Sequence, residues 1–167
     1  LQKYFLAATL SSSVGIYGPV FEYMVSDAIP GKEEYMDSEK YQIRHWDWNK
    51  ENKITMLISK INQIRNEQES LQQTNNIEFC DTDNEQIIAY YKYDDKKQNE
   101  TLMIVSLDAY YSKQAWVKLP LSSLGINEGK SITVIDQITG NSYHWDKEWN
   151  FVELHPALPF HLFKIQK

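Results

Sequence analysis

The chain has 167 residues, 42% of them hydrophobic and 24% charged, a composition that suits a globular protein and excludes a disordered or collagen-like one. Its 17 lysines and arginines stand against 23 acidic residues, a net charge of -6, so it lacks the basic surface that nucleic-acid binding requires. No apolar run approaches the roughly 18 residues that span a bilayer, and we expect no membrane association.

The first ten residues predict a helix. Their apolar members share one stripe at helical spacing: Leu1, Tyr4, Phe5 and Ala8. The run from Val14 to Tyr17 is β-prone, and Gly18-Pro19 closes it because proline cannot continue a hydrogen-bonded ladder. We therefore expect a helix followed by one short buried strand.

Residues 20 to 50 show no sustained period, and Pro30-Gly31 is a turn signal, so this segment is expected to be a long loop with a helical turn. Long loops within compact domains usually carry function. From Asn52 to Leu71 the apolar residues return at a 3.6-residue period opposite a polar face, which predicts the best helix of the chain. The stripe comprises Ile54, Leu57, Ile58, Ile61, Ile64 and Leu71.

From Ile77 onward the pattern alternates in twos, with turn residues such as Thr139-Gly140-Asn141 between short apolar runs. We place a domain boundary near residue 73, which separates residues 1–73 from a β-sandwich over residues 74–167. The expected strands are Ile77 to Cys80, Gln86 to Tyr93, Thr101 to Leu107, Gln114 to Leu119, Ser131 to Ile135, Ser142 to Trp145, Phe151 to Leu154 and Phe160 to Ile165.

The residues do not indicate a metal site or a cofactor site. The only cysteine, Cys80, excludes an internal disulfide and favours a reducing, cytoplasmic compartment. We expect neither a metal nor a cofactor, because the four histidines are scattered without metal-ligand spacing. They are His45, His144, His155 and His161.

The long loop is rich in carboxylates, and glycoside chemistry uses two of them facing each other across the bond. Proximity in sequence does not establish that geometry, and a solvated acidic loop explains the same residues. They are Glu22, Glu33, Glu34, Asp37 and Glu39. The segment from Asp37 to Asp47 differs, because it combines charged hydrogen-bonding groups with a Tyr and a Trp, the mixture that holds a sugar by hydroxyl contacts and ring stacking.

Three motifs resemble one family. They are LAATLSSSVGIYGPVFE from Leu6 to Glu22, EYMDSEKYQIRHWD from Glu34 to Asp47, and WNFVELHP from Trp149 with its LPFHLF ending. They are similar to segments of the maltosyltransferases of glycoside hydrolase family 13, in the α-amylase clan, which use maltose 1-phosphate to extend α-1,4-glucans. The first resembles the clan's entry into its eighth barrel strand, and the second is characteristic of the maltosyltransferase branch.

The resemblance implies a mixed fold, with the end of a (β/α)8 barrel (helix, strand, loop and helix) followed by an all-β C-terminal sandwich. It also implies that the chain, which begins with Leu rather than Met, is the C-terminal quarter of a longer retaining enzyme whose substrates are maltose 1-phosphate and α-1,4-glucan. The family's catalytic carboxylates lie on earlier strands. No catalytic residue is therefore expected among these 167 residues, which should be inactive alone.

In the family, a Glu-Lys-Tyr trio in this loop lies beside the donor sugar, which implies substrate-binding roles for Glu39, Lys40 and Tyr41. Lys40 would donate to sugar hydroxyls, and Tyr41 would stack or hydrogen bond. The alternative is that the trio only fixes the loop through salt bridges. The neighbouring residues expected to pack the loop are Arg44, His45 and Trp46.

Rival interpretations remain open. An ordinary α-amylase-type hydrolase is the alternative among enzymes, and the motif from Asp37 to Asp47 argues against it. A carbohydrate-binding β-sandwich module would be supported by exposed Trp116, Trp145 or Trp149 on one flat face. A purely structural role, in which residues 74–167 cover the rim of the barrel, is favoured for the sandwich.

A lone barrel strand would lack neighbours, so Val14 to Tyr17 and the stripe of residues 1–10 are expected to be exposed. We expect the helix from Asn52 to dock on the sandwich through Leu57, Ile61 and Ile64. Residues 1–50 would then be covered by a second copy, as a homo-oligomer, or be poorly ordered.

Overall fold

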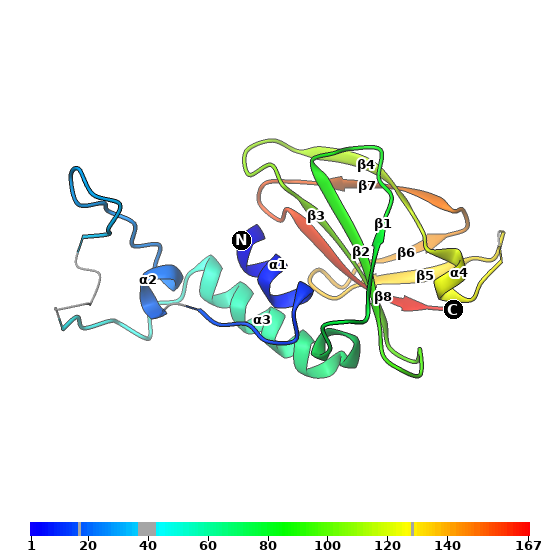
Figure 1. The fold of residues 1–167 in the computed structure, drawn as a ribbon, viewed down its shortest axis with the longest axis horizontal. Coiled ribbons are helices and arrows are strands. Elements are labelled where there is room, and N and C mark those ends of the chain that lie inside the picture. Colours follow the sequence, from blue (N-terminus) through cyan, green and yellow to red (C-terminus); the bar gives the residue numbers. More distant parts are fainter. Residues whose placement is uncertain (17, 37–42, 128) are drawn as a thin grey trace.

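The computed structural model describes residues 1–16, 18–36, 43–127 and 129–167. All eight expected strands are present, each within two residues of its expected bounds. Six form an antiparallel sheet in the order β1-β2-β3-β8-β5-β6, and β4 and β7 form a second, two-stranded sheet (Figure 1). The strands are β1 (Ile77–Cys80), β2 (Ile87–Tyr93), β3 (Glu100–Ser106), β4 (Lys113–Lys118), β5 (Ile132–Asp136), β6 (Ser142–Trp145), β7 (Trp149–Leu154) and β8 (Phe160–Gln166).

One apolar core lies between the two sheets, as expected for a β-sandwich. In β7, Val152 and Leu154 point into this core, whereas Phe151 and Glu153, which alternate with them, point to solvent, because successive strand side chains face opposite sides. A short helix, α4 (Leu121–Leu124), closes the end of the core through Leu124. The strand β3 is buried along its whole length, since its other face is covered as well.

That other face carries a layer of helices, α1 (Gln2–Leu10) and α3 (Lys53–Glu67), followed by a 3₁₀ turn, Glu69–Gln72 (Figure 1). The helix that follows Asn52 docks on the sheet through Ile61 and Ile64, as expected. The third expected contact residue, Leu57, is only half-buried, and the neighbouring Ile58 is buried instead. The shared second core comprises Tyr4, Phe5, Ala8, Ile58, Ile61, Ile64, Leu71, Tyr90, Met103, Val105, Phe160 and Leu162.

The expectation that the stripe of residues 1–10 is exposed is wrong. The Phe5 side chain is fully buried, and its ring stacks on Phe160 of β8 with centroids 4.0 Å apart. The apolar face of the large sheet needs a cover, and α1 supplies it from the same chain. A second copy is therefore not needed over α1, and its presence over the following loop stays a prediction.

Two basic side chains hold the carboxyl end of α1. Lys92 of β2 is fully buried, and its Nζ donates to the carbonyls of Thr9 (3.2 Å) and Gln73 (2.6 Å). Arg65 of α3 donates to the carbonyl of Ser11 at 3.2 Å. Helix ends leave carbonyls without intrahelical partners, and a nearby cation also favours the helix dipole. Burial lowers the pKa of Lys92 to about 8.

The start of α3 is set by a capping box at Asn52. Its Oδ1 accepts from the backbone N–H groups of Ile54 (2.8 Å) and Thr55 (3.1 Å), and Thr55 Oγ1 accepts from the Asn52 N–H at 3.0 Å. The Asn52 amide also donates to the Glu22 carbonyl at 2.9 Å. This bond ties the beginning of α3 to the end of α2 (Gly18–Glu22).

The expected strand from Val14 to Tyr17 does not form in the described part: residues 14–16 are irregular, and Tyr17 lies outside the described residues. An isolated extended run has no ladder to join in this chain, which is the physical reason for the difference. The segment leads to α2, the helical turn expected in the long loop. Together α2 and the loop extend away from the sandwich (Figure 1).

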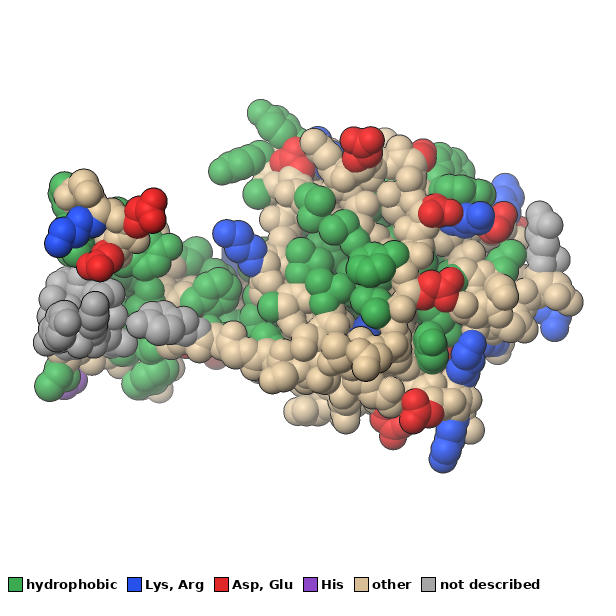
Figure 2. Space-filling model, viewed as in Figure 1, with side chains coloured by type: hydrophobic (Ala, Val, Ile, Leu, Met, Phe, Trp, Pro, Cys, Tyr) green, Lys and Arg blue, Asp and Glu red, His purple; other side chains and the backbone are tan. Residues whose placement is uncertain are grey.

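Apolar side chains are exposed at several places on the molecule, two of which lie on the face that Figure 2 shows. Figure 2 shows hydrophobic side chains gathered over β1 to β3, where Phe79 is 64% exposed, and on the extension around α2. The exposed large apolar residues of the extension are Met24, Tyr35, Met36, Ile43 and Trp48. None of the helices in the described ranges is long and apolar enough to cross a membrane.

Candidate functional site in the loop after α2

The predicted substrate-binding residues, Glu39, Lys40 and Tyr41, lie outside the described residues, and their roles stay predictions. The structure does describe the two arms of chain that lead to them. One arm ends at Met36 and the other begins at Ile43. The contacts of these two arms are described below.

The first arm is a small hairpin. Ala28 and Tyr35 form an antiparallel bridge, the Ile29 N–H donates to the Glu34 carbonyl at 2.8 Å, and the Met36 N–H donates to Asp27 at 2.6 Å. The expected turn at Pro30-Gly31 lies at its tip, where Gly31 has a φ of 77°, a conformation that favours glycine. The arm is thus held by backbone pairing up to Met36.

The second arm packs on α2's end through aromatic contacts. Trp46 stacks on Tyr23 with centroids 5.6 Å apart and planes inclined by 8°, and the Tyr23 hydroxyl donates to the Asp47 carbonyl at 2.7 Å. The Arg44 guanidinium lies 4.6 Å from the Trp46 ring centroid. The expectation that Arg44 and Trp46 pack the loop is confirmed, whereas His45 is exposed.

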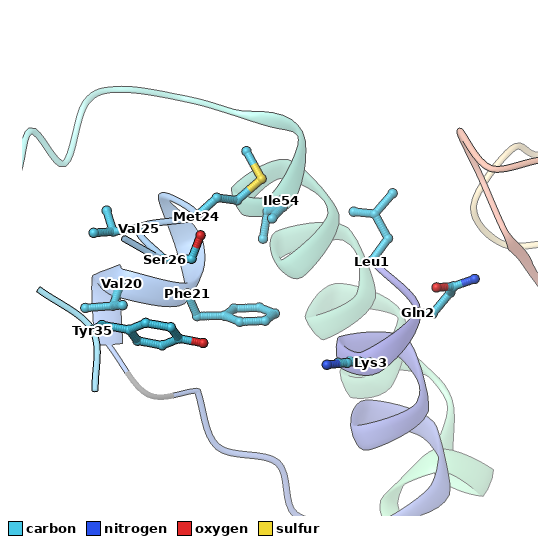
Figure 3. A pocket seen from close by; sticks show the side chains of 10 residues that line it. All are labelled: Leu1, Gln2, Lys3, Val20, Phe21, Met24, Val25, Ser26, Tyr35 and Ile54. Carbon is cyan, nitrogen blue, oxygen red and sulfur yellow. The ribbon is translucent and has the colours of Figure 1, made fainter. Parts of the chain in front are cut away.

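A groove of about 430 Å³ lies between α1, α2 and α3 at the base of these arms. Figure 3 shows the Phe21 ring pointing from α2 toward α1, with Leu1 and Ile54 beside the same space. Its described lining is mostly apolar and carries no carboxylate among these residues: Leu1, Gln2, Lys3, Val20, Phe21, Met24, Val25, Ser26, Tyr35 and Ile54. The described walls of the groove therefore have the chemistry of a packing surface and supply no pair of carboxylates for glycoside cleavage.

The acidic residues of the described loop are solvated. Glu33 and Glu34 are exposed on the hairpin, and Glu22 is half-buried at the end of α2. No group of three or more His, Cys, Asp or Glu side chains that could hold a metal ion comes together in the part of the chain that the structure describes. Asp37 lies outside that part, as Glu39 does.

The sandwich presents an aromatic surface of its own, apart from the loop after α2. Trp116 and Trp149 are exposed, on neighbouring strands of the small sheet, whereas Trp145 is buried and packs edge-on against Phe163. In β4, Trp116 lies between the buried Ala115 and Val117, so the alternation of the strand indicates its outward face. Trp145 is the buried last residue of β6, after three exposed ones.

Comparison with known proteins identifies relatives over nearly the whole chain. The family model described as "GLGE, C-terminal" matches residues 79–165. The α-1,4-glucan:maltose-1-phosphate maltosyltransferase of Methylacidiphilum infernorum is 41% identical over 167 residues, which are 99% of this chain and 25% of the relative. The protein of that name from Chlorobaculum tepidum is 39% identical over 170 residues, 98% of this chain and 25% of the relative. The chain thus spans about a quarter of the length of these relatives.

Solved structures agree with the fold. The α-amylase of Geobacillus thermoleovorans, complexed with acarbose, matches with a TM-score of 0.56 and 14% identity, over 80% of this chain and 27% of the other. The maltogenic α-amylase AmyB of Thermotoga neapolitana matches with a TM-score of 0.54 and 17% identity, over 71% of this chain and 27% of the other. At such identities the likeness concerns the fold alone.

Proposed function

The chain belongs to the family described as "GLGE, C-terminal", and from that premise we propose that it is the C-terminal part of a retaining maltosyltransferase. That enzyme would move maltosyl from maltose 1-phosphate to the non-reducing end of α-1,4-glucans. The observation that carries the proposal is the 39–41% identity, across almost the whole chain, to maltosyltransferases of which it spans a quarter.

In the proposed mechanism, maltosyl passes from phosphate to an aspartate nucleophile, and the 4-hydroxyl of a glucan end then attacks the covalent intermediate. The family resemblance assigns the nucleophile, the general acid and the stabilising aspartate to segments other than these 167 residues. The solvated Glu33 and Glu34 accord with this assignment, since neither faces a second carboxylate across a cleft in the described part.

We further propose that residues 1–73 complete a (β/α)8 barrel and that residues 74–167 are the sandwich that follows it. Support comes from the Geobacillus α-amylase match, which covers 80% of the chain, more than residues 74–167 alone supply. The exposed apolar side chains around α2 and the groove of Figure 3 are then surfaces for the rest of the barrel. Val14 to Tyr17 would become a strand where barrel neighbours supply its ladder.

The loop after α2 would lie at the carboxyl end of the barrel strands, where such enzymes bind substrate. Both arms of the loop are anchored, one by the hairpin that ends at Met36 and the other by Trp46 on Tyr23. We assign donor-sugar contacts to Glu39, Lys40 and Tyr41 on this basis and on the family resemblance.

The test is Lys40→Ala in the whole protein that contains this chain. A charged hydrogen bond to a ligand is worth about 1.5–3 kcal/mol, so kcat/KM for maltose 1-phosphate should fall about 10- to 150-fold with little change in Tm. Lys32→Ala, at an exposed lysine of the same loop, is the matched control and should leave both quantities unchanged. An unaltered kcat/KM in Lys40→Ala would assign the lysine to fixing the loop.

A cytoplasmic location is part of the proposal. Burial raises the pKa of the single cysteine, Cys80, to about 12, so its thiol stays protonated and unreactive at neutral pH. A partly buried free thiol suits a reducing compartment.

A further inference from the structure

We propose that the β-sandwich carries a second α-glucan-binding site, separate from the loop after α2. This sandwich site consists of a pocket between β6, β7 and β8 and of the exposed rings that adjoin it on the small sheet. The choice of an α-glucan as ligand rests on the proposed function, whereas the site itself rests on the geometry of its residues.

The rings stand on the outer face of the small sheet. Trp116 of β4 pairs directly with Phe151 of β7, the ring centroids are 5.6 Å apart, and the two residues are 46% and 48% exposed. The inward positions of these strands are filled by Ala115, Val117 and Val152, so the core does not require the outer rings. Flat exposed rings are the surfaces on which the apolar face of a pyranose stacks.

The pocket begins at Phe151, so rings and pocket form one continuous surface. Its volume is about 360 Å³, within the range of small-molecule sites. Aromatic side chains form half of its wall, and two histidines and a glutamate contribute polar groups: Tyr143, Trp145, Phe151, Val152, Glu153, His155, His161 and Phe163.

His161 is held in one orientation by a buried partner. Its Nδ1 lies 2.9 Å from Asp136 Oδ2, and its ring stacks on Phe163 with centroids 4.9 Å apart. Burial alone would raise the pKa of Asp136, but hydrogen bonds from His161 and from the Ile138 N–H outweigh it and hold that pKa below its usual value. The Asp136 carboxylate thus fixes the ring, and His161 Nε2, which has no hydrogen-bond partner among the described residues, is left for a hydroxyl.

The opposite rim is polar as well. His155 Nδ1 hydrogen bonds with Ser112 Oγ at 2.9 Å, and Glu153 Oε1 accepts from the Gln114 amide at 3.0 Å. Glu153 Oε2 lies 3.9 Å from His155 Nε2. Rings alternate here with fixed donors and acceptors, which suits a chain of pyranoses with apolar faces and hydroxyl edges. An apolar protein segment would offer no partner to His161 Nε2 and would bury the partly exposed Glu153 carboxylate, which costs free energy.

A second binding point has a physical use in an enzyme that extends a polymer. Once one stretch of a glucan is held on the sandwich, its end reaches the active site at a raised effective concentration. Short acceptors cannot bridge both places. The sandwich site therefore discriminates by acceptor length without touching the reacting atoms.

The experiment measures binding of maltoheptaose to the 167-residue chain by titration calorimetry, with cellohexaose, a β-linked glucan, as the ligand control. Trp116→Ala removes an exposed ring from the small sheet, Tyr143→Ala removes one from the pocket, and Trp48→Ala removes an exposed tryptophan elsewhere. Circular dichroism establishes that each variant is folded. We expect maltoheptaose to bind in preference to cellohexaose, a loss of about fivefold or more in affinity in the two site variants, and no change in Trp48→Ala.

Absence of maltoheptaose binding, equal binding of cellohexaose, or unchanged affinity in Trp116→Ala and Tyr143→Ala would overturn the proposal. These outcomes are independent of the transferase activity, which is measured on the whole protein. Transfer without binding by this chain would reject the sandwich site alone. Binding by this chain, with a whole protein that transfers no maltosyl, would reject the proposed function alone.

Discussion

The Phe5→Ala variant should lose about 3–5 kcal/mol of unfolding free energy, because it empties a fully buried site between α1 and the large sheet. The ring of Phe5 lies on Phe160 at 4.0 Å, so the truncation leaves a cavity that the β8 backbone is too constrained to fill. Urea unfolding followed by circular dichroism measures the loss.

The matched control is Phe79→Ala, which makes the same truncation at a site that is 64% exposed. It should cost less than about 1 kcal/mol, since little apolar surface returns to water. Equal, small losses in both variants would mean that α1 does not pack on its own sheet, and the expectation of a bare N-terminal segment would stand after all.

The second large effect is expected at Asp136, whose carboxylate is fully buried against His161 and accepts from the Ile138 N–H at 2.9 Å. Removing one partner of a buried pair leaves the other uncompensated, so Asp136→Ala should cost about 3 kcal/mol at pH 7. The exposed Asp146, in the next turn, gives the control variant Asp146→Ala, with an expected change within about 0.5 kcal/mol.

The pH dependence of this loss follows from the lowered pKa of Asp136. A carboxyl whose pKa is lower in the folded state contributes stability above its unfolded pKa, about 3.9, and loses that contribution as the pH falls through the folded value. The difference between the wild type and Asp136→Ala should therefore be full at pH 7 and shrink below pH ~4 in urea unfolding. A difference that is constant down to pH 3 would contradict the role of the ionised carboxylate.

Much of the fold could be predicted because apolar and polar residues alternate along the strands themselves. Each strand alternates between a buried and an exposed face, or is bounded by turn residues, and the signal is local. The division into sheets is not local. The pairing of β3 with β8 joins residues such as Met103 and Leu162, and no spacing in the sequence specifies that β4 and β7 leave the large sheet together.

The errors at the N-terminal end share one cause. The spacing of Tyr4, Phe5 and Ala8 predicted a helix with an apolar face, which is confirmed, but the partner of that face is a sheet formed 80 or more residues later. The β-prone run from Val14 has no neighbouring strand to pair with in the described part of this chain. Its β-propensity alone does not make it a strand.

The candidate site divides in the same way. Residue types indicated a sugar-binding mixture between Asp37 and Asp47, while the roles of Glu39, Lys40 and Tyr41 came from family resemblance. The contact of Trp46 with Tyr23 joins two ends of a long loop and could not be predicted from spacing. The separation of exposed Trp116 from buried Trp145 required the strand faces to be known.

The most direct test of the central claim compares the whole protein with this chain alone. Each is incubated with maltose 1-phosphate and maltohexaose, phosphate is assayed, and products are sized by mass spectrometry. We expect the whole protein to release phosphate while maltohexaose grows by maltosyl units, and the 167-residue chain to do neither. Glucan hydrolysis without phosphate release by the whole protein, or turnover by the chain alone that Glu39→Gln abolishes, would contradict it.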